Sequence, residues 1–141
     1  MDSTPSPQAT RPSRFTYIRF LEALLGSLPE TEYRADVGSW AKAIYDLREL
    51  YEAECPELFE DIVFLERHPL PPHSDQVAGF LMIEQQADVT NVYNPGFERL
   101  QIREERKELL RRRSKAVMDA YGAKIEEMVQ AILPRVSLPK D

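Results

Sequence analysis

The sequence is poor in the residues that build the commonest sites of small proteins. It has one cysteine, two histidines and five glycines among 141 residues. A single cysteine excludes a disulfide framework and a zinc site made of several thiolates. The glycines do not occur in GxGxxG or GxxxxGK spacing, so no phosphate-binding loop is indicated. Since no run of 18 apolar residues occurs, we also expect no membrane-spanning segment.

What the chain does contain is a globular composition, with 43% hydrophobic and 30% charged residues. Its length suits one domain with its own core. Residues 1–13 hold three prolines among small polar residues and lack the apolar stretch of a secretory signal. We therefore expect a flexible arm over 1–13, a single domain over 14–133 and a tail over 134–141. The lone Cys55 in a chain without an export signal fits a cytoplasmic protein.

Apolar residues recur every three or four positions along most of the chain, which predicts a mainly α fold. We expect a compact domain of about five helices, over 14–26, 36–55, 56–66, 75–86 and a long C-terminal helix from about 98 or 103 to 133. The helix over 75–86 is the most apolar, so we expect it at the centre of the core. Charge dominates the first half of the long helix, which we therefore expect to project into solvent or meet a partner.

Three segments leave alternatives open. The pattern over 61–66 also fits a short strand, and we favour helix because Pro56 stands where a helix begins. Prolines crowd residues 68–73, which predicts an extended linker. The turn residues Asn94-Pro95-Gly96 lie between two β-prone pieces, which predicts one small β-hairpin near 89–102. An irregular loop leading into the last helix is the alternative there.

The net charge of −6 conceals a strongly uneven distribution. Residues 28–67 hold eleven acids and four bases, whereas residues 103–115 hold seven bases and three acids. The basic residues of the second segment are our candidate partner-binding residues: Arg103, Arg106, Lys107, Arg111, Arg112, Arg113 and Lys115. Three interpretations fit them. They form a solvated helix face with internal pairs such as Glu108–Arg112, a docking surface for an acidic protein, or a set of phosphate contacts to nucleic acid.

No group of residues has the pattern of an active site. His68 and His73 are five residues apart across a proline-rich linker, which is not the spacing of a zinc-binding helix. Cys55 precedes Pro56 at a helix end, where a structural role is the simpler interpretation. Adjacent acids such as Glu60 and Asp61 point to different helix faces. We therefore predict no catalytic, metal or cofactor site, and no enzyme.

The function that this profile favours is a non-enzymatic interaction or regulatory protein. It would bind a larger protein or complex through its charged long helix, as a phage-type regulator of host transcription machinery does. The alternative is a small winged-helix-like DNA-binding regulator, with the hairpin at 94–96 as the wing. The last helix would then be the seam of a homodimer. Nucleic acid ranks second because the helix over 75–86 carries no lysine or arginine.

Overall fold

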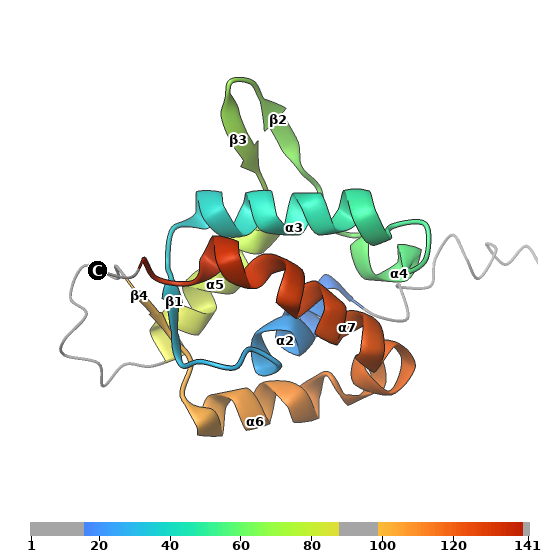
Figure 1. The fold of residues 1–141 in the computed structure, drawn as a ribbon, viewed down its shortest axis with the longest axis vertical. Coiled ribbons are helices and arrows are strands. Elements are labelled where there is room, and N and C mark those ends of the chain that lie inside the picture. Colours follow the sequence, from blue (N-terminus) through green and yellow to red (C-terminus); the bar gives the residue numbers. More distant parts are fainter. Residues whose placement is uncertain (1–15, 88–98, 140–141) are drawn as a thin grey trace, which may run out of the picture.

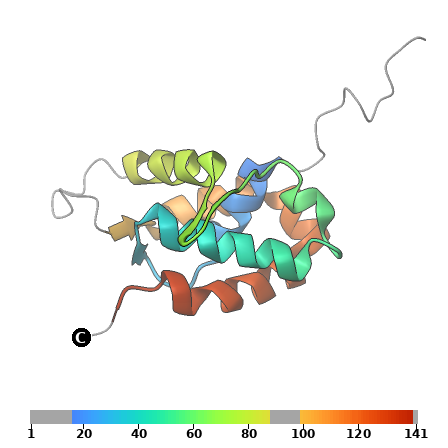
Figure 2. The same cartoon turned by 90° about the horizontal axis from the view of Figure 1, so that it is seen from above.

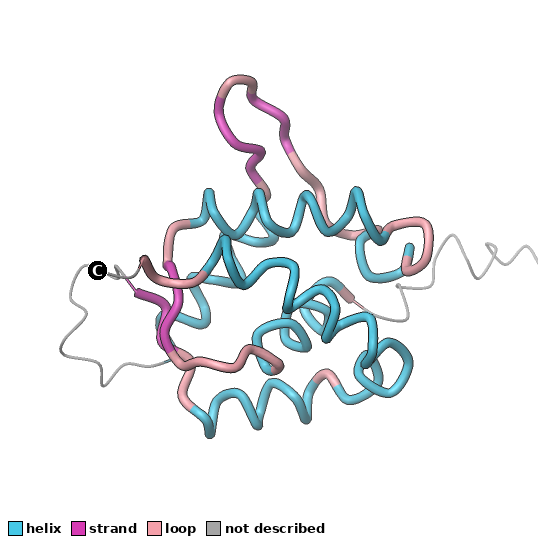
Figure 3. The backbone as a smooth tube through the Cα atoms, viewed as in Figure 1, coloured by secondary structure: helices cyan, strands magenta, loops and turns pink. Residues whose placement is uncertain are grey.

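The computed structural model describes residues 16–87 and 99–139. Within them the chain is mainly helical and carries two small antiparallel two-stranded sheets (Figure 1, Figure 3). In chain order the elements are α2 (Tyr17–Gly26), β1 (Glu32–Arg34), α3 (Val37–Tyr51), α4 (Pro56–Phe59), β2 (Leu65–Arg67), β3 (Leu70–His73), α5 (Asp75–Ala87), β4 (Arg99–Gln101), α6 (Glu104–Arg113) and α7 (Lys115–Val136). The predicted fold class, mainly α with a long C-terminal helix, is confirmed.

Helix α2 is the centre of the core. Every residue from Phe20 to Gly26 is buried, and the helix packs against both α6 and α7. The seven consecutive buried residues of α2 place its second half in the interior, whereas α3 buries one stripe that includes Trp40 and Ile44. The prediction that the helix over 75–86 occupies the centre is wrong. That helix is α5, which leaves Met82 and Ile83 exposed.

Strand β1 joins three distant parts of the chain. It pairs antiparallel with β4, so that Tyr33 lies opposite Leu100, and Tyr33 also forms an isolated bridge with Ser137. The Tyr33 hydroxyl accepts a hydrogen bond of 2.5 Å from the Glu30 amide. Burial raises the pKa of Tyr33 to about 12. Most of the hairpin predicted near 89–102 lies outside the described residues, and its last part is the strand β4.

The segment after Pro56 differs from the prediction. The third helix ends at Phe59, and the chain continues into the hairpin β2–β3, which projects beyond α3 (Figure 1). The helix ends early because the apolar residues after it do not share a buried face, and Val63 is exposed. Phe64 instead packs edge-on against Tyr45 of α3, with ring centroids 5.4 Å apart. The proline-rich residues expected as a linker form β3.

The long helix is divided at Ser114 into α6 and α7. The buried Ser114 hydroxyl donates to the Leu110 carbonyl at 2.8 Å, and its backbone leaves helical geometry. Contrary to the expectation of a projecting helix, α6 packs on α2 and buries Leu110. Helix α7 continues through Pro134 to Val136, past the predicted domain end at 133. No helix within 16–87 and 99–139 is long and apolar enough to cross a membrane.

Candidate arginine-rich interface

The seven predicted partner-binding residues occupy α6 and its two ends. Arg103 precedes α6, Lys115 begins α7, and the other five lie within α6 itself. They differ sharply in accessibility, because one long side of α6 faces α2 and α5 while the other faces solvent. The structure therefore separates them into residues that hold the fold together and residues that a partner can reach.

Lys107 and Arg111 donate hydrogen bonds to backbone carbonyls at the carboxyl end of α2 and just after it. Lys107 is buried, and its ammonium donates to the carbonyls of Leu28 at 3.0 Å and Glu30 at 3.1 Å. Arg111 Nη1 donates to the Gly26 carbonyl at 2.6 Å. Cations at this position complement the helix dipole and satisfy carbonyls that lack a helical partner. The structure thus places Lys107 where a partner cannot reach it.

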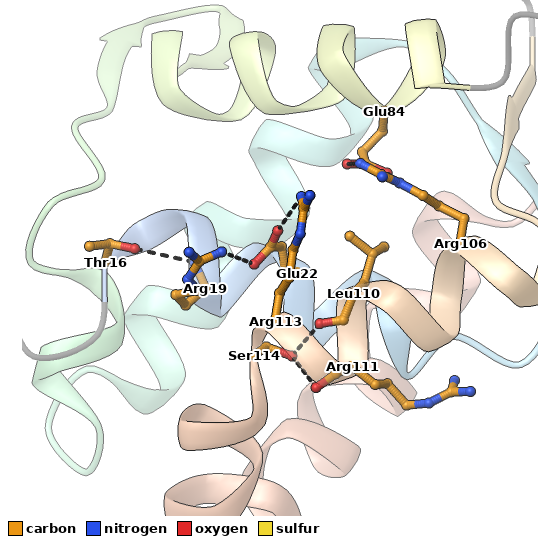
Figure 4. Close-up of polar contacts among 9 residues, drawn as sticks. All are labelled: Thr16, Arg19, Glu22, Glu84, Arg106, Leu110, Arg111, Arg113 and Ser114. Carbon is orange, nitrogen blue, oxygen red and sulfur yellow. Dashed lines mark hydrogen bonds and ion pairs between the residues drawn. The ribbon is translucent and has the colours of Figure 1, made fainter.

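Arg106 connects α6 to α5 through Glu84. Its Nε and Nη2 donate to the two carboxylate oxygens of the buried Glu84, at 2.9 and 2.7 Å (Figure 4). These hydrogen bonds are the main reason that the pKa of Arg106 is raised. A two-point contact of this kind fixes orientation as well as distance. Arg106 is therefore a structural clamp between two helices.

A second buried carboxylate, Glu22 of α2, organises two arginines that remain accessible. Arg19 Nη1 lies 2.7 Å from Glu22 Oε1, and Arg113 Nη1 lies 3.5 Å from Glu22 Oε2. Figure 4 shows the two side chains approaching Glu22 from α2 and α6. Glu22 is 2% exposed, whereas the arginine side chains are 48% and 47% exposed. Each guanidinium therefore keeps other N–H groups on the solvent side.

The corner between α6 and α7 adds two more cations. Arg112 is exposed, and its side chain makes no hydrogen bond or ion pair with any residue in the described part of the chain. Lys115 is exposed and pairs with Asp119 at 2.8 Å, and this neighbour raises the pKa of Lys115. The Glu108–Arg112 pair that the spacing suggested is not formed. We call Arg19, Arg112, Arg113 and Lys115 the arginine surface.

Sequence reasoning missed Arg19 and both glutamates. The basic run drew attention to residues 103–115, although Arg19 lies far from it in the sequence. One signal was present, because Glu22 interrupts the apolar run Phe20–Leu25. A carboxylate that must be buried needs a cationic partner. Arg19 lies three residues before Glu22 on the same helix, so local spacing could have indicated this partner. The second partner, Arg113, depends on the packing of α2 on α6, which no local pattern specifies.

The other candidate groups do not assemble a reaction centre. Burial is the main cause that raises the pKa of the Cys55 thiol, which disfavours the reactive thiolate. His73 contacts Asp75 at 2.8 Å, while His68 lies 3.9 Å from a different carboxylate, that of Glu66. Among residues 16–87 and 99–139, no three histidine, cysteine, aspartate or glutamate side chains gather as metal ligands would.

The candidate site is therefore a charged surface in which one buried carboxylate, Glu22, holds two of the exposed cations, Arg19 and Arg113. Guanidinium groups exposed in this way can donate hydrogen bonds to carboxylates and phosphates. Comparison of the chain with protein-family models, with curated proteins and with solved structures found no match.

Proposed function

We propose that this chain is a non-enzymatic binding protein whose arginine surface docks on an acidic surface of a larger protein or protein complex. The observation that carries the proposal is the anchoring of Arg19 and Arg113 by the buried Glu22. Side chains already held in place lose less conformational entropy when a partner binds. Their free N–H groups suit two-point contacts to carboxylates. A machine with an acidic face, such as a transcription complex, offers such groups.

The charge balance favours an acidic protein over nucleic acid. Segment 28–67 carries eleven acids, which repel a phosphate backbone wherever it approaches them. Glu22 also neutralises part of the charge of the arginines above it. No aromatic residue occurs in 103–115 to stack on bases. Local carboxylates on a protein can use the arginine surface without approaching the acidic segment.

A double charge reversal, Arg112→Glu with Lys115→Glu, tests the proposal. Both side chains are exposed and neither holds a buried partner, so the thermal melt should remain within about 2 °C of the wild type. Recovery of the wild-type partner in affinity purification from the source cells, quantified by mass spectrometry, should fall at least about tenfold. The captured partner should present an acidic surface.

The matched control is Lys42→Glu with Arg67→Glu. It changes the net charge by the same amount on α3 and β2, and it should leave the partner's recovery unchanged. Equal loss with both double variants would mean that only net charge matters. Undiminished recovery with the Arg112→Glu, Lys115→Glu variant would show that the arginine surface is not the docking site.

One observation favours the second candidate, a winged-helix-like DNA-binding protein. The strands β1 and β4, which flank α3 and α5 in the sequence, pair with each other, as the strands of such a domain do. Against it, α5 carries no lysine or arginine, and its outer face shows Asp75 and Met82. Titration of duplex DNA at about 50 mM salt decides between them. If the wild type binds DNA saturably and the Arg112→Glu, Lys115→Glu variant does not, the arginine surface binds DNA and the proposal of a protein partner is wrong.

A further inference from the structure

Exposed apolar side chains concentrate in one stretch of the sequence, which forms the β2–β3 hairpin and helix α5. Five of the seven large hydrophobic residues exposed in the described part of the chain come from the stretch 63–83. The seven are Ile18, Leu50, Val63, Leu65, Leu70, Met82 and Ile83. Single exposed hydrophobics are ordinary, whereas a local concentration marks an interaction surface. Within this stretch, Met82 and Ile83 share the rigid helix α5.

Helix α5 turns a nearly uncharged stripe to solvent. Its inner face holds Val77, Phe80, Leu81 and Glu84, and Glu84 is neutralised by Arg106. On the opposite face Asp75, Gly79, Met82 and Gln86 follow one another at spacings of four, three and four. Residues so spaced form one row along a helix. All four residues are exposed, and Figure 2 shows α5 along one edge of the molecule.

The row is complementary to itself when its direction is reversed. In an antiparallel pair of α5 helices, Gly79 faces Met82 of the other copy, and Asp75 faces Gln86. Gly79 leaves open space on the surface of the helix there, because a Cβ built on it meets no described atom within 4 Å. The flexible side chain of a methionine from the other copy can occupy that space. The Gln86 amide can donate to the Asp75 carboxylate, and antiparallel helices align their dipoles favourably.

We propose that α5 is a self-association surface that joins two copies of this chain antiparallel across a two-fold axis. A two-fold contact uses the same residues twice, so each Met82 is buried against the other copy's Gly79. We take the partner to be a second copy because the row matches itself when its direction is reversed. The large Met82 then lies opposite the small Gly79, and the donor Gln86 lies opposite the acceptor Asp75. Each chain has a net charge of −6, but this row contains only one charged residue, Asp75. Two copies can therefore bring their rows together with little electrostatic repulsion at the contact. This surface is distinct from the arginine surface.

The C-terminal helix, which the sequence suggested as the contact between two copies, packs its apolar stripe inside its own chain. The apolar stripe of α7, which includes Val117, Ile125 and Ile132, is buried within the same chain. A dimer built on that stripe would require α7 to leave the core. The outer face of α5 requires no such rearrangement, since its side chains are already exposed.

Light scattering on a sizing column tests the proposal with the full chain. At about 100 μM the wild type should show twice the mass of 16.3 kDa, and Met82→Asp should weaken dimerisation by about 30-fold or more. The matched control Leu50→Asp changes a comparably exposed residue of α3, 67% against 57% exposed, and should remain dimeric. A wild type that stays monomeric up to about 200 μM, near the weak end of ordinary dimers, would overturn the proposal.

A second variant guards against effects on folding. Gly79→Leu fills the open space at Gly79, so Met82 of the other copy can no longer pack there. The same change should raise the helix propensity of α5. We therefore expect a monomer whose melting temperature, measured at about 1 μM protein, is at least that of the wild type. A dimer that survives both Gly79→Leu and Met82→Asp would place the contact elsewhere and contradict the assignment to α5.

Discussion

At the scale of single residues, the molecule is characterised by charges inside an apolar core. Glu22, Glu84 and Lys107 are buried, and each is satisfied by an opposite charge or by carbonyl groups. The sequence drew attention to the basic residues of α6 as candidate partner-binding residues, which stays a prediction. It could not show that Arg106 contacts Glu84, or that Lys107 donates to the Leu28 carbonyl, because these partners lie at least 22 residues away in the sequence. Lys107 also pairs at 2.8 Å with Glu104, three residues before it on the same helix. The distant pairings arise from packing, not from local spacing.

The Arg106–Glu84 clamp should behave as a coupled pair. Arg106→Met leaves the carboxylate of Glu84 buried without its cation, so unfolding free energy should fall by about 3 kcal/mol. Adding Glu84→Met removes the stranded charge, and the double variant should regain most of that loss. Urea unfolding of both single variants and the double variant measures the coupling. Independent, additive losses would show that the pair contributes nothing as a pair.

At the scale of elements, the sequence predicted where helices lie better than where they end. Asp36 caps α3, since its carboxylate accepts from the Ser39 amide at 3.0 Å. The end of the third helix and the break at Ser114 were missed. The first depends on a tertiary contact, because Phe64 packs against Tyr45 of α3. At the second, the Ser114 hydroxyl donates to the Leu110 carbonyl four residues before it. Serine alone is too common within helices to predict a break.

The contact between α2 and α6 should be sensitive to one methyl group. A Cβ at Gly26 would lie 3.0 Å from Arg111 Cγ and 3.2 Å from the Lys107 carbonyl, so Gly26→Ala should cost about 1–3 kcal/mol of unfolding free energy. In the control Gly38→Ala, the added Cβ meets nothing closer than 3.9 Å, and stability should not fall. Chemical denaturation of the two variants side by side gives the comparison. Equal stabilities would mean that α2 and α6 are free to separate.

At the scale of the whole molecule, ion pairs join parts that carry opposite charge. Asp46 of the acidic segment contacts Arg135 of α7 and Lys42 at 3.1 Å. Burial disfavours ionisation of Asp46, but these cations outweigh it and lower its pKa. For Asp36 burial is likewise outweighed, by hydrogen bonds from Ser39 and by Arg34, and its pKa is lowered too. Folding is therefore linked to the ionisation of both carboxyls.

The linkage predicts a loss of stability in acid. Because the folded pKa values lie below the ordinary value of about 3.9, both groups stabilise the fold fully above that pH. Their contribution disappears as the pH falls below about 4 and through the folded values. Circular-dichroism melts between pH 6 and about 2.5 should show a smaller acid loss for Asp46→Asn than for the wild type. Parallel curves for the two proteins would contradict this origin of the pH dependence.

The projecting hairpin β2–β3 has a practical consequence for engineering the chain. Its tip, at His68, is 90% exposed, while its base is held to α3 by the edge-on contact between the rings of Phe64 and Tyr45. The entropy of closing a loop grows only slowly with its length, so added residues at the tip should cost the fold little. A fluorescent or epitope tag inserted between His68 and Pro69 would stand away from both α5 and the arginine surface. Such an internal tag leaves both ends of the chain free for attachment to other modules.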